Sequence, residues 1–154
     1  MAATKLQAFL NDMGVRYELV EHPLAYTAPE TAEAAHVLGR SFAKTVIVEI
    51  GGGMAMVVLP AIRKIVLSDL QDMLLDQDVR VATEDEFIAR FPDCEPGAMP
   101  PFGNLYGLPV YVARSLARQT EIAFNAGTHR EVIKMSFADF AALVRPTVLD
   151  FAMA

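Results

Sequence analysis

Helix-start signals alternate with β-prone segments along this chain, and that alternation constrains the fold more than any other feature of the sequence. Thr27, Thr83 and Ser136 are each followed three residues later by Glu or Asp. In this pattern the hydroxyl accepts a hydrogen bond from a backbone N–H in the first turn of a helix. Segments rich in valine and isoleucine lie between these signals. The alternation predicts an α/β or α+β domain around a mixed sheet.

Capping residues, apolar spacing and stop signals place the expected elements along the chain. Helices are expected at residues 4–13, 27–38, 68–75, 83–90 and 136–145. Strands are expected at residues 16–20, 44–50, 54–59, 79–81, 109–113, 121–124 and 131–135. Three consecutive glycines, Gly51 to Gly53, indicate a hairpin between two of these strands. No linker or internal repeat interrupts the pattern, so residues 1–154 are expected to form one domain.

The composition limits the class of protein. Hydrophobic residues make up 53% and charged residues 21% of the 154 residues, which is too apolar for a disordered chain. No run of about 20 apolar residues occurs, and the N-terminus lacks the apolar core of a signal peptide. A soluble, cytoplasmic protein with no membrane contact is therefore expected. One cysteine, Cys94, and three scattered histidines give no metal-ligand spacing, so no metal or cofactor is expected.

The charge is acidic and evenly spread. The chain holds 13 basic and 19 acidic residues, a net charge of −6. Residues 1–77 carry 6 basic and 9 acidic residues, and residues 78–154 carry 7 and 10, so each half has a net charge of −3. Non-specific binding to duplex DNA needs many Lys and Arg to neutralise phosphates. Duplex DNA is therefore not an expected partner, although a small site for one or two phosphates is compatible with this composition.

The interval of residues 91–108 stands apart from the periodic segments. It contains four prolines and three glycines together with several large apolar side chains. Long loops of this kind in compact domains are often functional, because proline stiffens them and glycine lets the backbone approach a ligand. The alternative is an apolar loop folded over the core. Lys44, at the start of an apolar strand, has two similar interpretations: a cation in a site, or a side chain that extends along the surface to reach water.

Three motifs, taken in order, resemble a known family. A lysine opens an apolar strand in Ala43-Lys44-Thr45-Val46, and a glycine hairpin follows. Residues 97–103, Gly-Ala-Met-Pro-Pro-Phe-Gly, contain a Gly-x-x-x-Pro loop, and residues 124–129 read Phe-Asn-Ala-Gly-Thr-His. Over nearly its whole length the chain is similar to the YbaK family of single-domain aminoacyl-tRNA deacylases, which are related to the editing domain of bacterial prolyl-tRNA synthetases.

The resemblance implies both a fold and a reaction. The fold would be a central mixed β-sheet, partly barrel-like, flanked by helices. The reaction would be hydrolysis of the ester between a wrong amino acid and the 3′ end of tRNA. The partner would be a mischarged tRNA, and an aminoacyl-tRNA synthetase is a second candidate partner. Lys44 would contact the terminal nucleotide or its phosphate, and the loop Gly97–Pro101 would offer backbone N–H groups to the ester carbonyl. Water, positioned with help from the 2′-hydroxyl of the terminal adenosine, would be the nucleophile.

The resemblance also assigns residues to the site. Lys44, Gly97 and Pro101 are expected to serve catalysis. Expected substrate-binding residues are His22, Tyr26, Thr45, Ala98, Met99, Pro100, Phe102, Gly103, Gly127 and His129. Thr45 is a departure, because some relatives have Asn directly after the lysine. The sequence does not predict the amino acid, the tRNA, a synthetase partner or the oligomeric state.

Several alternatives stay open at the level of sequence. His129 is either on the rim of the site or an exposed turn histidine, and contact of His22 with substrate is likewise undecided. A cysteine hydrolase would use Cys94 with His129 as base, but the flanking Asp93 and Glu95 disfavour a thiolate. A catalytically silent module that binds tRNA or a synthetase is the alternative function.

Overall fold

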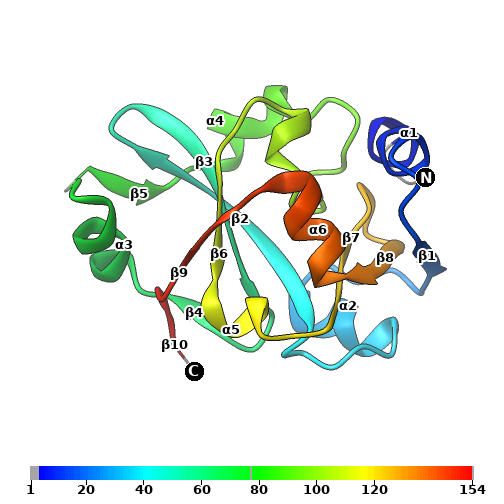
Figure 1. Cartoon of the computed structure of the whole chain (residues 1–154). Coiled ribbons are helices and arrows are strands. Elements are labelled where there is room, and N and C mark those ends of the chain that lie inside the picture. Colours follow the sequence, from blue (N-terminus) through cyan, green and yellow to red (C-terminus); the bar gives the residue numbers. More distant parts are fainter. Residues whose placement is uncertain (1–3, 77, 154) are drawn as a thin grey trace.

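A mixed β-sheet forms the centre of the protein (Figure 1). The structure is a computed structural model and describes residues 4–76 and 78–153. The sheet order is β1-β8-β7-β2-β3-β6-β9. In addition, β5 pairs with the last three residues of β2, Val48 to Ile50. Its strands are β1 (Tyr17–Glu21), β2 (Phe42–Ile50), β3 (Gly53–Pro60), β5 (Val79–Val81), β6 (Val110–Ala113), β7 (Glu121–Asn125), β8 (Glu131–Ser136) and β9 (Thr147–Leu149). The strands β4 (Lys64–Ile65) and β10 (Ala152–Met153) form a separate pair.

Helices lie on both sides of this sheet. They are α1 (Thr4–Asp12), α2 (Ala28–Ala34), α3 (Leu67–Leu74), α4 (Glu84–Phe87), α5 (Arg114–Ala117) and α6 (Phe137–Val144), with the 3-10 turns η1 (Ile88–Arg90) and η2 (Gly103–Leu105). Leu6 of α1 and Phe140 of α6 belong to the largest buried cluster. Leu70 of α3 and Ala32 of α2 belong to two smaller clusters.

The strand β2 shows how the clusters divide between the two faces of the sheet. Ala43 and Ile47 are in the largest cluster, whereas Phe42 and Val48 are in the two smaller ones. Successive side chains of a strand point to opposite faces. Lys44 therefore points to the face that carries α2 and α3, and Thr45 points to the face that carries α1 and α6.

The expected mixed sheet between helices is confirmed. The parallel pairs are β2 with β7, β3 with β6 and β6 with β9, and the other neighbouring pairs of the main sheet are antiparallel. Among the described residues the sheet is open, because its outermost strands β1 and β9 pair only with β8 and β6. The partly barrel-like sheet that the resemblance implied is therefore not a closed barrel.

Local capping chemistry was largely predictable. Thr27 and Thr83 form capping boxes with Glu30 and Glu86, and the Ser136 side chain accepts from the Asp139 N–H. The helix expected at residues 68–75 is present but begins one residue earlier, at Leu67, and has no side-chain cap. The second helix is shorter than predicted. It ends at Ala34, after which His36 takes a left-handed conformation with φ 57°.

Candidate functional site

A hydrogen-bonded clamp joins the Gly-x-x-x-Pro loop to the turn between β7 and β8. The Glu95 N–H donates to the Gly127 carbonyl at 2.7 Å, and the Gly127 N–H donates to the Ala98 carbonyl at 3.0 Å. The Glu95 side chain accepts from the His129 N–H, with 2.6 Å between Oε1 and N. Two segments about thirty residues apart in sequence are thus held in one geometry, which is the preorganisation a binding site needs.

Gly97 presents its backbone at the surface of this clamp. Its φ of +84° is a left-handed conformation that favours glycine, and the residue is exposed. The N–H groups of Gly97 and Met99 make no hydrogen bond to any residue that the structure describes. Between them, the Ala98 N–H donates to the Glu95 carbonyl. Two backbone donors without a partner in the described chain therefore flank one structural residue, the first at exposed Gly97 and the second at buried Met99.

The rest of the loop is part of the core. Phe102 is fully buried and contacts Phe9, Phe124 and Phe140 with ring centroids 5.4–6.3 Å apart. Ala98, Met99, Pro100 and Pro101 are buried as well. A Cβ on Gly103 would overlap the Leu108 carbonyl oxygen, which makes that glycine a packing requirement. Residues 98–103 therefore form an apolar loop folded over the core. Gly97 faces outward, so only this part of the loop fits the interpretation as a loop that approaches a ligand.

The His129 ring is fixed by a hydrogen bond to the loop. Its Nε2 lies 2.7 Å from the Pro96 carbonyl oxygen, which can only accept, so Nε2 carries a proton and donates. Its Nδ1 is buried with no partner among the described residues. The residue is 8% exposed, so the alternative of an exposed turn histidine is wrong. Tyr26, which is largely exposed, covers the ring with centroids 4.8 Å apart.

His22 repeats this arrangement. Its Nδ1 lies 2.7 Å from the Pro23 carbonyl oxygen, and its buried Nε2 has no partner within the described part of the chain. The His22 N–H donates to the Arg130 carbonyl, and the Ala25 N–H donates to the His129 carbonyl. The segment from His22 to Tyr26 therefore lies against the β7–β8 turn. Two buried imidazole nitrogens with no partner in the described chain, His22 Nε2 and His129 Nδ1, therefore flank this turn.

Lys44 reaches the same region through strand pairing. Ala43 is opposite Phe124 in the parallel pair of β2 and β7. The next residue of β2, Lys44, therefore lies beside Asn125, the last residue of β7. Burial lowers the pKa of Lys44, and the nearby Lys64 lowers it further. No acidic side chain or other hydrogen-bond partner meets the Lys44 ammonium in residues 4–76 and 78–153. A half-buried, unpaired cation of this kind is suited to a ligand anion.

Two residues near this site were not predicted. Asn125 ends β7 with its Oδ1 buried and unpartnered in the described chain, and by alternation along β7 it shares the face of Lys44. Glu95 anchors the clamp, although the sequence indicated only its effect on Cys94. Its position two residues before the loop glycine could have drawn attention to it. Thr45 also has a buried hydroxyl with no described partner, but it points to the opposite face from Lys44.

Cys94 lies outside this arrangement. Its Sγ contacts the Tyr106 hydroxyl at 3.5 Å, and that hydroxyl donates to Asp93. Burial, with a smaller contribution from Asp93, raises the pKa of the Cys94 thiol to about 11. The His129 ring nitrogen Nε2 is committed to Pro96, and no contact joins it to Cys94. The geometry gives no support to a cysteine nucleophile activated by His129.

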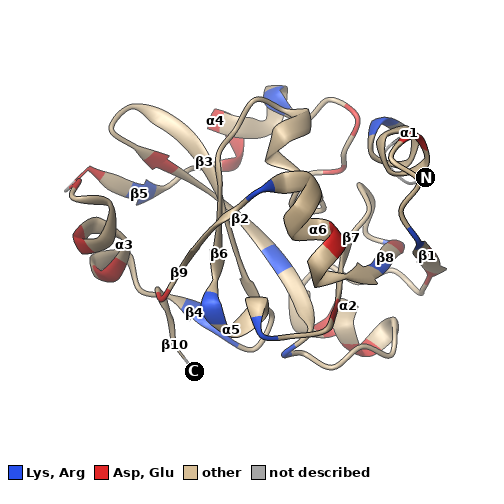
Figure 2. Cartoon of the chain, viewed as in Figure 1, with Lys and Arg blue, Asp and Glu red and all other residues tan. Residues whose placement is uncertain are grey.

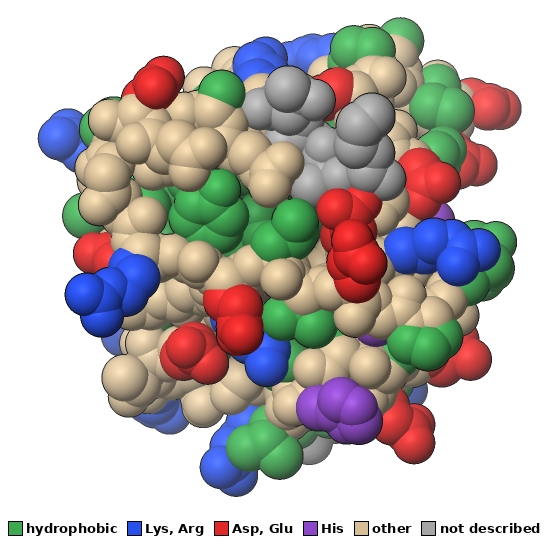
Figure 3. Space-filling model, turned by 90° about the vertical axis from the view of Figure 1, so that its right-hand side faces the viewer, with side chains coloured by type: hydrophobic (Ala, Val, Ile, Leu, Met, Phe, Trp, Pro, Cys, Tyr) green, Lys and Arg blue, Asp and Glu red, His purple; other side chains and the backbone are tan. Residues whose placement is uncertain are grey.

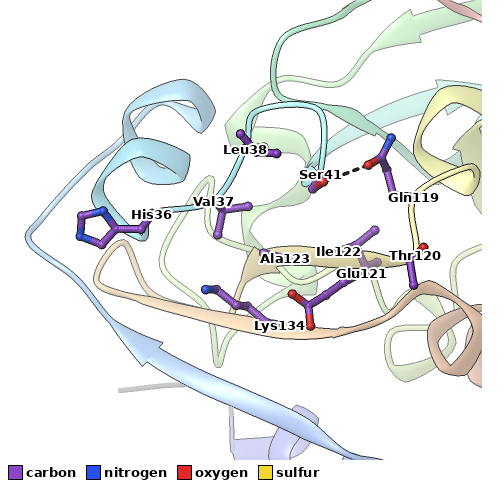
Figure 4. Close-up of a pocket in the computed structure, with 10 residues that line it drawn as sticks. All are labelled: His36, Val37, Leu38, Ser41, Gln119, Thr120, Glu121, Ile122, Ala123 and Lys134. Atoms are coloured by element: carbon purple, nitrogen blue, oxygen red, sulfur yellow. Dashed lines mark hydrogen bonds between the residues drawn. The ribbon is translucent and has the colours of Figure 1, made fainter.

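Hollows also lie outside the clamp. One of about 370 Å³ lies between the α2–β2 connection and β7, with Ser41 and Gln119 hydrogen-bonded at its edge (Figure 4). Another of about 300 Å³ is lined by Glu21, His22, Arg130 and Glu131. No group of three potential metal ligands occurs in the described residues, and no described helix is long and apolar enough to cross a membrane.

Known structures share this fold. A protein proposed to be a trans-editing enzyme for prolyl-tRNA synthetase matches with a TM-score of 0.85 and 23% identity, over 99% of this chain and 97% of that one. The hypothetical protein APE2540 matches with 0.85 and 20%, over 97% and 99% of the two chains. A scaffold protein used in computational epitope backbone grafting matches with 0.84 and 22%, over 99% and 97%.

The sequence itself identifies the family. Among curated proteins, no sequence matches this chain. The model of the aminoacyl-tRNA editing domain, however, matches residues 22–143, which is most of the chain and contains the clamp, both histidines and Lys44. The resemblance drawn from three short motifs is thereby confirmed. This chain belongs to the aminoacyl-tRNA editing domain family.

Proposed function

We propose that this protein is a deacylase that hydrolyses the ester of a mischarged tRNA, acting in trans as one domain of residues 1–154 in the cytoplasm. The observation that carries the proposal is the clamp. It fixes the exposed, left-handed Gly97 beside the buried His129 imidazole. The N–H groups of Gly97 and Met99 have no hydrogen-bond partner among the described residues. Family membership supports the editing role, and this geometry supports the hydrolytic chemistry.

In the proposed reaction the ester carbonyl lies against the backbone of Gly97. The N–H groups of Gly97 and Met99 donate to its oxygen as negative charge develops there. Preorganised donors of this kind stabilise a tetrahedral intermediate strongly, by about 10²–10³ in rate for a single donor. Pro100 and Pro101 have no N–H to offer; they stiffen the loop behind the donors.

Water then attacks the carbonyl carbon, and the bond from that carbon to the ribose oxygen breaks. The leaving ribose oxygen takes up the proton that the water gives up, with the neighbouring 2′-hydroxyl of the terminal adenosine relaying it. The His129 Nδ1 accepts a hydrogen bond from that hydroxyl or from the water, which orients it. The Lys44 ammonium pairs with the terminal phosphate. Ala98, Met99 and Tyr26 border the space for the amino acid.

A deacylation panel tests the proposal. Alanyl-, cysteinyl- and seryl-tRNA are incubated with excess protein under single-turnover conditions, with the protein-free ester as reference. At least one ester is expected to disappear far faster than the reference. Loss of every ester at the spontaneous rate would contradict deacylation. Binding of deacylated tRNA or of a synthetase by the same sample would then support the silent module.

A further inference from the structure

Five cations line one edge of the molecule, although the chain as a whole is acidic. Figure 2 shows Lys and Arg positions along the edge formed by the α2–β2 connection, β4 and α5. We call this surface the basic edge. It consists of Arg40, Arg63, Lys64, Arg114 and Arg118.

Strand register and hydrogen bonds bring these residues together. Val58 is opposite Val112 in the pair of β3 and β6, so Arg114, which begins α5, lies near the end of β3. The turn after β3 carries Arg63, and Lys64 is the first residue of β4. The Ala61 N–H of that turn donates to the Gly39 carbonyl, directly before Arg40.

A side-chain hydrogen bond completes the edge. The Ser41 hydroxyl donates to the Gln119 side chain at 3.0 Å, which ties the residue after Arg40 to the residue after Arg118 (Figure 4). Segments from three parts of the chain therefore form one continuous border. Lys44 is next to it, since Lys44 is opposite Leu59 near the end of β3.

The five cations are free to meet a ligand. None of them has an ion pair or a side-chain hydrogen bond within residues 4–76 and 78–153. Four are exposed and Arg63 is half-buried. The acidic residues Glu121, in β7, and Asp150, between β9 and β10, border the edge without pairing with it. The face turned toward the viewer in Figure 3 is different, because there acidic and basic side chains are interspersed.

We propose that the basic edge binds the phosphate backbone of the tRNA acceptor stem and so delivers the 3′ end to Lys44 and the clamp. This proposal rests on the proposed function for the identity of the RNA. A protein of net charge −6 repels a polyanion at long range, so binding needs a local group of unpaired cations. The edge supplies that group beside Lys44, which the reaction places against the terminal phosphate. A protein partner would be favoured by a larger apolar centre than the exposed Leu38 and Ile62, which neighbour Arg40 and Arg63 in the sequence.

The experiment measures RNA binding separately from catalysis. The probe is a deacylated hairpin with the acceptor stem and a single-stranded CCA end, and its Kd is measured at several salt concentrations. The test variant is Arg114→Glu with Arg118→Glu. Its matched control is Arg16→Glu with Arg145→Glu, two exposed arginines outside the edge that give the same change in net charge.

The wild-type protein is expected to bind the hairpin with a slope of about −3.5 to −4.5 in log K against log salt, as for four or five phosphate contacts. The edge variant is expected to bind at least tenfold more weakly with a shallower slope, and the control is expected to stay near wild type. Circular dichroism and Tm show whether each variant is folded. If the reversed charges unfold the protein, the pair Arg114→Gln with Arg118→Gln is measured in its place, with a smaller loss expected.

Cleavage of aminoacyl-CCA trinucleotide, which lacks the stem, separates the two proposals. The edge variant is expected to cleave it at the wild-type rate while its KM for aminoacyl-tRNA rises. Wild-type affinity and salt slope in a folded edge variant would overturn the basic edge but leave deacylation intact. An equal loss in the control would also overturn it, because overall charge would then be the cause. Failure of the wild-type protein to cleave either ester would contradict deacylation, while the binding result would still stand.

Discussion

The two ends of β2 carry opposite charges. At its first residues Lys44 lies beside the basic edge, whereas Glu49 near the hairpin lies among acidic side chains (Figure 2). The acidic end comprises Glu49, Asp69, Asp72, Asp76, Asp78, Glu84, Asp85 and Glu86. Arg80 is paired with both Glu49 and Glu86 there. At the acidic end one arginine pairs with two of these carboxylates, whereas the cations at the basic end have no ion pair among the described residues.

From this difference we infer that a ligand binds at the basic end. Exposed pairs such as Arg80 with Glu86 satisfy each other and contribute modestly to stability. Half-buried Lys44 has no such partner, so the protein bears a desolvation penalty at this position. A penalty of that kind is expected where the missing partner is a substrate.

The largest expected effect comes from removing the charges of Lys44 and Glu49, both in β2, in separate variants. Lys44→Met is expected to lower the single-turnover deacylation rate by about 10³, because a cation against the terminal phosphate is lost. Glu49→Gln is expected to leave the rate within about twofold of wild type. Rates are measured with enzyme in excess. Equal rates for Lys44→Met and wild type would remove Lys44 from the site.

The stability of the same variant sharpens this prediction. Because burial lowers the pKa of Lys44 below 10.5, the charged form disfavours the folded state. That penalty is complete below the lowered pKa and disappears as pH rises past 10.5. Lys44→Met is therefore expected to have an equal or higher Tm at pH 7, with the gain shrinking at high pH. A large drop in Tm would instead indicate a structural lysine.

Two left-handed glycines provide the next contrast. Gly97 has φ +84° beside the clamp, and Gly52 has φ +88° in the hairpin. Alanine at either position is strained by about 1 kcal/mol, so both variants are expected to lose similar stability. Only Gly97→Ala is expected to lose activity, by about 10², because the donors beside the ester are displaced. Single-turnover rates and Tm distinguish the two outcomes, and similar rates for both variants would make the loop purely structural.

Arg80→Ala tests the acidic end by itself. The guanidinium lowers the pKa of Glu86 to about 2, so the pair stabilises the fold above the ordinary carboxyl pKa and loses this effect as pH falls toward 2. The variant is expected to show a small drop in Tm at pH 7 that diminishes below pH 4.5. Thermal melts across pH measure it. A loss of deacylation in the folded variant would show that the acidic end also serves the reaction.

The smallest effect is expected at Cys94. Because its thiol pKa is raised to about 11, little thiolate exists at neutral pH. Cys94→Ser is expected to keep the wild-type rate, and the native thiol is expected to react slowly with iodoacetamide. Inactivation of a folded Cys94→Ser protein would restore the cysteine hydrolase as an explanation.

Elements with strong local signals were predictable from the sequence. Thr27, Thr83 and Ser136 cap helices because a hydroxyl and nearby N–H groups are all the chemistry that a cap requires. The elements that were not predicted, β4, α5, β9 and β10, span two to four residues each. Segments this short have no periodicity of their own, and contacts with distant strands determine them.

Within the candidate site the same division applies. The motifs around Lys44, Gly97 and Gly127 were visible because each is a short run of sequence. The role of Glu95 was not visible, since its hydrogen bond to His129 joins residues 34 positions apart. The hydrogen bonds of the His22 and His129 rings likewise depend on where the carbonyls of Pro23 and Pro96 lie.

The sequence alone determined the order of helices and strands, the glycine hairpin, the loop–turn motifs and the net charge, because each depends on neighbouring residues or on a simple sum. It indicated an evenly acidic chain in both halves. Only the tertiary structure separated that charge into a basic edge and an acidic end, since parallel pairing of β3 with β6 and the Ser41–Gln119 hydrogen bond bring distant segments together. Electrostatic potential depends on distances in space, and the sequence gives only distances along the chain.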